Sequence, residues 1–76
     1  MSKFLTFDEI RTHTLNGNVV ESRRKLAVNI DHVTRIFPVV GEPERCNLCL
    51  SDEPSPFEVE GSLENVVEKM NTALKY

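Results

Sequence analysis

Two cysteines separated by two residues come closest to a chemical motif in this sequence. Cys46 and Cys49 enclose Asn-Leu in the stretch CNLC, a spacing found in zinc sites and in redox-active dithiols. If residues 45–52 form a strand, the two thiols point to opposite faces and their Cα atoms lie about 10 Å apart, beyond the roughly 7 Å that a disulfide spans. We therefore expect Cys46 in the core, no bound metal and no Cys46–Cys49 disulfide.

Other groups suited to catalysis or metal binding are scarce in the chain. A closed zinc site needs four ligands, and the sequence has two histidines, His13 and His32. His32 follows Asp31, and a carboxylate–histidine pair can serve acid–base chemistry. The sequence has no glycine-rich phosphate loop and no nucleophile within a recognisable motif. We interpret His32 as a surface residue and predict a protein that is not an enzyme, without catalytic residues, metal or cofactor.

The basic run Arg23-Arg24-Lys25 is the feature that could contact phosphates. No aromatic residue stands beside it to stack on bases, and the chain carries a net charge of −3. The hairpin register derived below also places acidic residues opposite Arg24 and Lys25. A solvated protein face is therefore favoured over a nucleic-acid interface.

The dipeptide Asn16-Gly17 predicts the element that carries this run. Asn-Gly is preferred in two-residue β-hairpin turns because both central residues need positive φ. Such a turn pairs positions whose numbers sum to 33, which predicts a hairpin of residues 3–15 with residues 18–29. The register opposes residues that suit each other, in the pairs Leu5–Val28, Phe7–Leu26, Asp8–Lys25 and Glu9–Arg24.

An alternative for the first strand is a short helix at residues 7–12. Thr6 and Glu9 match a capping box that would open it. The β-branched Thr12 and Thr14 disfavour a helix, so the strand is the preferred interpretation.

The rest of the chain predicts further strands and a closing helix. Ser62 is a suitable N-cap. Apolar residues at helical spacing then form one stripe expected to pack on the sheet, namely Leu63, Val66, Val67, Met70 and Leu74. In chain order we expect a helical turn near residues 30–33, a strand at 34–40, a turn at 41–44, a strand at 45–52, a loop at 53–56, a strand at 57–60 and a helix at 62–74. The fold class is α+β, an antiparallel sheet of four to five strands with a long N-terminal hairpin and one C-terminal helix.

Length and composition predict one small soluble domain over residues 1–76. A chain of this size buries about 60% of the surface that its unfolded form exposes, so its core is thin. No apolar run reaches the roughly 18 residues that a membrane helix needs, and the start of the sequence does not resemble a signal peptide. We expect a cytoplasmic protein with no membrane contact.

The segment from "LAVNIDHVTRIFPV" through "CNLCLSDEPSPFEVEGSLENVVEKM", within residues 26–70, resembles the small FlbD-type bacterial proteins. A strand leads into an Ile-x-x-Val turn, strands follow, and a helix opens with Ser-Leu-Glu. The segment is more distantly similar to LytTR-type DNA-binding domains. The first resemblance implies a small accessory protein, and the second implies DNA reading. Neither assigns a function to an individual residue.

Charge is unevenly distributed along the chain. Residues 1–41 carry six basic and four acidic residues, whereas residues 42–76 carry three basic and eight acidic ones. Contact between a basic and an acidic surface favours association, and two-fold symmetry is the commonest arrangement of homo-oligomers. The hairpin also has a polar middle, and a ribbon without an apolar face is marginal alone. We therefore expect a homodimer with residues 8–25 at the interface.

The predicted function is that of a small non-catalytic binding or regulatory module that acts through protein–protein contacts. Its partner is a second copy of the chain or another protein, and a phage or bacterial inhibitor or accessory protein belongs to this class. The alternatives are a nucleic-acid binder that uses the basic hairpin and an oligomer that binds a small molecule such as a nucleotide at a subunit boundary. The candidate partner-binding residues are Ile10, Arg11, His13, Arg23, Arg24 and Lys25.

Overall fold

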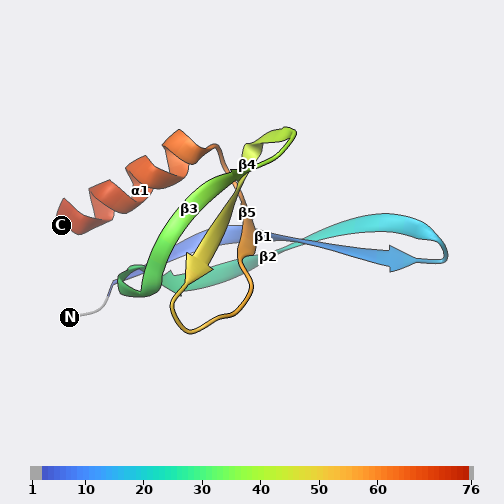
Figure 1. The fold of residues 1–76 in the computed structure, drawn as a ribbon, viewed down its shortest axis with the longest axis horizontal. Coiled ribbons are helices and arrows are strands. Elements are labelled where there is room, and N and C mark those ends of the chain that lie inside the picture. Colours follow the sequence, from blue (N-terminus) through green and yellow to red (C-terminus); the bar gives the residue numbers. More distant parts are fainter. Residues whose placement is uncertain (1–2, 76) are drawn as a thin grey trace.

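The computed structural model describes residues 3–75 and confirms the predicted α+β class. Figure 1 shows an antiparallel sheet with a long hairpin at one side and a helix near the opposite end of the molecule. The elements within the described residues are β1 (Phe4–Leu15), β2 (Asn18–Asn29), the 3-10 turn η1 (Ile30–His32), β3 (Val33–Val39), β4 (Glu42–Leu50), β5 (Phe57–Glu60) and α1 (Leu63–Lys75).

The N-terminal hairpin is confirmed in both extent and register. Every β1–β2 pair sums to 33, from Phe4 opposite Asn29 to Leu15 opposite Asn18. The turn residues take the left-handed conformation that the Asn-Gly turn requires, with φ of 52° at Asn16 and 79° at Gly17. The alternative helix at residues 7–12 is wrong, because cross-strand pairing along the hairpin outweighs the local capping signal.

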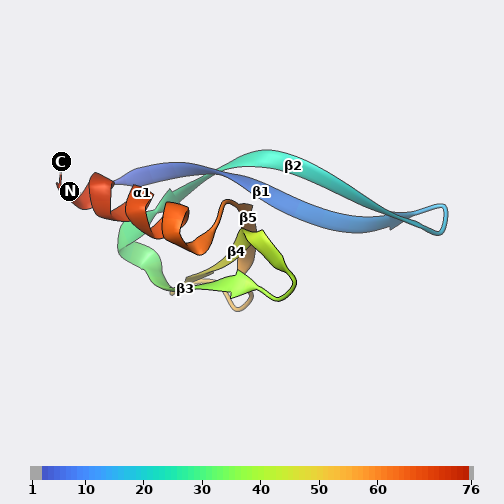
Figure 2. The same ribbon diagram turned by 90° about the horizontal axis from the view of Figure 1, so that it is seen from above.

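The sheet has the order β2-β1-β5-β4-β3, with antiparallel pairing throughout. β5 is four residues long and follows the other strands in sequence, yet it lies in the middle of the sheet. It joins the β1–β2 hairpin to the β3–β4 hairpin, because Val59 opposes both Glu9 and Cys46. α1 lies against one face of this sheet, as the two views show (Figures 1 and 2).

The core lies between α1 and the sheet. Cys46, Leu48 and Val59 are completely buried. Around them pack the other buried residues of the cluster, which are Phe7, Val28, Ile30, Val66 and Met70. Contacts between strands that are distant in sequence therefore hold this small core together.

The helix begins as predicted but faces the sheet differently. The Asn65 N–H donates to Ser62 Oγ at 3.2 Å, so Ser62 caps the first turn. The prediction that the whole apolar stripe packs on the sheet is wrong, because Val67 and Leu74 are 37% and 64% exposed. They follow Val66 and the partly buried residue 73 by one position each, and one position rotates a side chain by about 100° around the helix axis.

The two middle strands are shifted from their predicted bounds. β3 begins and ends one residue earlier than expected, and β4 already begins at Glu42. The expected turn at residues 41–44 shortens to residues 40–41, because Val39 pairs directly with Glu42. Gly41 allows this tight connection with a φ of 79°.

The outer half of the hairpin extends away from the rest of the molecule. We call residues 11–22 the arm and the other described residues the body. All arm residues are exposed except Val20, which is half-buried. The arm gives the molecule its elongated shape, with extents of 45 × 23 × 19 Å (Figures 1 and 2). None of residues 3–75 lies in a helix with the length and apolar character needed to span a membrane.

Candidate protein-binding surface

The basic run of β2 is paired with acidic residues of the same chain. Lys25 Nζ lies 2.8 Å from a carboxylate oxygen of Asp8, and Arg24 Nε donates to Glu9 Oε1 at 2.6 Å. Both pairs follow from the hairpin register, which puts these residues directly opposite each other. The hydrogen bond from Lys25 lowers the pKa of the Asp8 carboxyl. The charges of this run are therefore largely balanced within the hairpin.

Glu9 is the buried charged residue of the hairpin, with 5% of its surface exposed. A buried carboxylate is costly unless it is paired and hydrogen-bonded. Arg24 supplies that partner, although its own side chain is 55% exposed. Arg24 was predicted as a partner-binding residue, and the geometry gives it a structural task within the chain.

Ile10 also differs from its expected role. It was predicted to contact a partner, but it is 4% exposed. It lies three positions after Phe7, which packs in the core with α1, so its side chain points to the face opposite α1. Arg23 opposes it on β2, and continuing the β1–β5 register by one residue places Glu58 at its other side. Neighbouring charged side chains thus cover an apolar residue, which takes Ile10 away from the accessible surface.

A charge network spans the face of the sheet that α1 leaves open. Arg45 contacts Glu21 at 2.8 Å and Glu58 at 3.0 Å, and Arg23 contacts Glu60 at 3.3 Å. The hydrogen bond from Arg45 lowers the pKa of the Glu21 carboxyl, and the same contact raises the pKa of Arg45. The basic and acidic halves of the sequence thus pair with each other inside one chain. These intramolecular pairs neutralise part of the opposite charge on which the prediction of a dimer was based.

Arg11 and His13 are the candidate residues that the structure places on the arm. Both are exposed, and both lie on the same face of the ribbon, since they are two positions apart in one strand. The six candidates therefore separate into three groups. The arm carries two of them, the base of the hairpin holds three in ion pairs, and the sheet buries Ile10.

The cysteines behave as structural residues. Cys46 is completely buried, as predicted, and its Sγ donates to the carbonyl oxygen of Gly61 at 3.3 Å. Burial raises the pKa of the Cys46 thiol, which keeps it protonated near neutral pH. Cys49 lies three positions along β4, on the other face, and is half-buried. Across residues 3–75 no group of three or more His, Cys, Asp or Glu side chains is arranged to hold a metal ion.

His32 takes part in a structural clamp. Its Nδ1 lies 3.0 Å from Ser51 Oγ, and its carbonyl oxygen accepts a hydrogen bond from the Ser51 N–H at 2.8 Å. The preceding turn is closed by Asn29, whose side chain accepts from the Asp31 N–H at 3.0 Å. These bonds join η1 to the end of β4. Both His32 and Ser51 are exposed, and His32 also lines a pocket of about 320 Å³ at the base of the hairpin.

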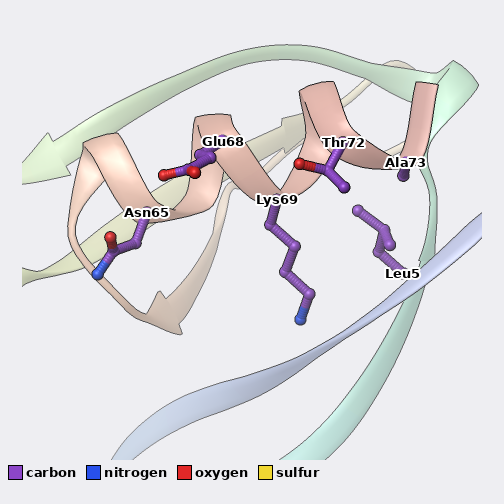
Figure 3. Close-up of a pocket in the computed structure, with 6 residues that line it drawn as sticks. All are labelled: Leu5, Asn65, Glu68, Lys69, Thr72 and Ala73. Atoms are coloured by element: carbon purple, nitrogen blue, oxygen red, sulfur yellow. The ribbon is translucent and has the colours of Figure 1, made fainter. Parts of the chain in front are cut away.

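One groove of about 510 Å³ runs between α1 and β1. Figure 3 shows Lys69 extending from the helix across this groove toward β1. Its Nζ donates to the Thr6 carbonyl oxygen and lies 4.6 Å from the centre of the Phe7 ring. Near the end of the helix, Lys3 Nζ donates to the Ala73 carbonyl oxygen. The two lysines bridge the groove, so its contacts hold the helix on the hairpin.

A second groove, of about 350 Å³, lies between α1 and β3 and was not predicted. Val67 and Leu74 form its helix side, and they are the stripe residues that the sheet leaves exposed. The sequence does contain a pattern that indicates this second groove. The apolar stripe of α1 is wider than one row of residues at i, i+4 and i+7, so part of it extends beyond the sheet.

Comparisons with protein-family models, with curated proteins and with solved structures found no match to this chain. The resemblance to FlbD-type and LytTR-type proteins stays a prediction.

Proposed function

We propose that this protein is a small non-catalytic module that acts through protein–protein contacts, and that it forms a homodimer through the arm. The observation that carries the proposal is the exposure of residues 11–22. Core packing and ion pairs hold the body together, whereas the arm extends into solvent beyond the contact of Glu21 with Arg45.

The surface area supports an association of this kind. The chain exposes 5371 Å², whereas a compact monomer of 8.7 kDa exposes about 4,700 Å². The excess of about 600 Å² is close to the roughly 800 Å² that each partner contributes to an interface of standard size. A dimer that covers the arm would return the exposed area to the value expected of a compact protein.

The backbone of the arm supports it as well. The pair Leu15–Asn18 flanks a two-residue turn and exchanges hydrogen bonds across the hairpin. Backbone groups alternate in direction along a strand, so those of residues 12 and 14 and of residues 19 and 21 point outward. A ribbon with two free edges is marginal in water and is a template for pairing with another chain.

Nucleic-acid binding has less support from the geometry. Arg23, Arg24 and Lys25 already contact carboxylates of the same chain. A phosphate would have to displace those partners. The arm itself carries one arginine and one glutamate, Arg11 and Glu21, so it offers no net positive charge.

Light scattering with a shortened arm tests the proposal. Removing residues 12–15 and 18–21 joins Arg11 and Ser22 to the Asn16-Gly17 turn. Four pairs are lost, so the alternation of hydrogen-bonded pairs around the turn is preserved. We expect the full chain to have twice the mass of 8.7 kDa at micromolar concentration and the shortened chain to be a folded monomer.

The matched control is Glu21→Gln in the full-length arm, because the deletion also removes the contact between Glu21 and Arg45. This variant should remain a dimer. A full chain that stays monomeric at every concentration and salt level would contradict the proposal. A shortened chain that still dimerises would show that the body carries the interface. If the monomer instead captures another protein through the arm, the contact function stands without self-association.

A further inference from the structure

We propose that the groove between α1 and β3 receives the tip of the arm from a second copy of the chain. The tip consists of residues 14–20. This inference rests on the proposed self-association and adds where the arm binds. Each copy would then contribute one tip and one groove.

The groove is an apolar surface that the chain itself does not fill. Most of its lining residues are apolar, and the polar Thr34 and Asn71 complete the uncharged part of the lining. The apolar ones are Ile30, Val33, Ile36, Met70 and the exposed Val67 and Leu74. Arg35 is its charged lining residue. Removal of apolar area of this kind from water by a partner favours association.

The edge of β3 restricts which partner can bind there. The Gly61 N–H donates to the Glu44 carbonyl oxygen, so Glu44 and every second residue after it direct their backbone groups toward β5. The residues between them bond to β3, which leaves Ile36 and Pro38 with backbone groups on the outer edge. Proline has no N–H to donate, and the register shifts at both ends of β3 shorten the edge further. The groove therefore favours a partner that inserts side chains over one that adds a strand.

The arm tip offers side chains of that type. Leu15 and Val19 are 57% and 74% exposed. They lie near the turn on opposite strands and, because Leu15 pairs with Asn18 and Val19 with Thr14, they point to opposite faces of the ribbon, so a tip that enters a groove end-on presents one apolar side chain on each face. No residue from 14 to 20 carries a charge at neutral pH, so the tip brings no charge to face Arg35 or to be buried. An uncharged tip that exposes apolar side chains thus suits a groove whose lining is mostly apolar and includes one cation, Arg35.

The shape of the molecule brings the two features together in a dimer. The arm tip lies at one end of the long axis, and α1 with its groove lies toward the other (Figure 1). A two-fold axis perpendicular to the long axis places two copies side by side in opposite directions. Each tip then reaches the groove of the other copy. Such an arrangement is closed, with both tips and both grooves used.

Site-directed cross-linking tests this placement. Val19→Cys is made in one preparation and Leu74→Cys in another, both with Cys49→Ser, while Cys46 stays buried. The two proteins are mixed and oxidised with glutathione disulfide. We expect a cross-linked species of twice the chain mass in the mixture and little of it in either protein alone.

The other outcomes separate this inference from the proposed function. Cross-linking of Val19→Cys with itself, and not with Leu74→Cys, would show that the arms associate tip to tip. It would overturn the groove assignment and leave the dimer intact. A dimer by light scattering without any cross-link would also overturn the assignment. A monomer by light scattering would remove the proposed function itself.

Affinity gives an independent measurement. Leu74→Asp should weaken dimerisation at least about tenfold, the effect of losing one contact at the centre of an interface. Leu74 is 64% exposed in the single chain, so the variant should keep its fold. Val40→Asp is the matched control, because Val40 is 98% exposed and does not line the groove. Equal affinity of Leu74→Asp and Val40→Asp would overturn the inference.

Discussion

The arm and the body show two ways in which one hairpin can be stabilised. At its base, β1 and β2 contribute Phe7 and Val28 to the core, and β1 also pairs with β5. In the arm, the same strands keep the same register but pair with no other strand, and the contact of Glu21 with Arg45 ties the base of the arm to the body. The comparison shows that register and packing are separate properties. The turn sequence determines the register of all twelve pairs, whereas tertiary contacts pack only the inner half of the hairpin.

The largest difference between the two regions should appear on truncating a core residue. Leu48 is completely buried, so Leu48→Ala should lower the free energy of unfolding by about 2–5 kcal/mol. Val19→Ala in the arm is the control and should change it by less than about 0.5 kcal/mol. Urea denaturation followed by circular dichroism measures both. A comparable loss in the two variants would show that the arm is part of the same packed unit.

The base of the hairpin should respond to the loss of Arg24. Arg24→Ala leaves the buried carboxylate of Glu9 without its cation, and we expect a loss of about 1–2 kcal/mol in the free energy of unfolding. Adding Glu9→Gln to this variant should restore part of the loss, because an amide is less costly to bury than a carboxylate. Arg11→Ala on the arm serves as the matched control in the same urea titration. Equal effects of Arg11→Ala and Arg24→Ala would count against a structural role of the ion pair.

The turn tests how tightly the arm folds with the body. Gly17 has a φ of 79° and no atom close to the position of an added Cβ, so Gly17→Ala introduces backbone strain alone. We expect a cost of about 1 kcal/mol. In native-state hydrogen exchange, this loss of stability should accelerate exchange at the amides of the arm and leave exchange at the amides of β4 nearly unchanged. Uniform acceleration across the whole chain would indicate a single cooperative unit.

Acid should act on the ion pair that connects the arm to the body. The pKa of the Glu21 carboxyl lies below its ordinary value of 4.5 because Arg45 donates a hydrogen bond to it. The contribution is therefore fully present above pH 4.5 and is lost as pH falls through the lower pKa of the folded state. The urea concentration at the unfolding midpoint should decrease as the pH is lowered from 6 to 3. The decrease should be smaller in Glu21→Gln, and an identical pH dependence in the two proteins would contradict the assignment.

The sequence predicted those structural features that depend on residues close to one another along the chain. Asn16-Gly17 was sufficient for the hairpin register, Ser62 for the start of α1, and the alternation around Cys46 for its burial. These signals act over a few positions, so each can be interpreted without knowing the rest of the fold.

Contacts between distant strands were not predictable in the same way. The insertion of β5 between β1 and β4 decides that Ile10 lies beside Glu58 and that Arg45 reaches Glu21. No local pattern gives that order. For this reason the sequence did not predict the burial of Ile10, one of the candidate partner-binding residues. The exposure of Val67 and Leu74 depends likewise on how wide a surface the sheet offers to the helix.

The position of β5 also has a consequence for the order of folding. The β1–β2 and β3–β4 hairpins each close over a short loop, and isolated hairpins form within about 1–10 μs. No hydrogen bond of the sheet joins these two hairpins until β5 arrives between them from near the end of the described chain. Closing such distant contacts is the slow part of folding for β-rich domains. A ribosome would therefore release most of the sheet as two unconnected hairpins, and the later synthesis of β5 and α1 would convert them into one packed unit.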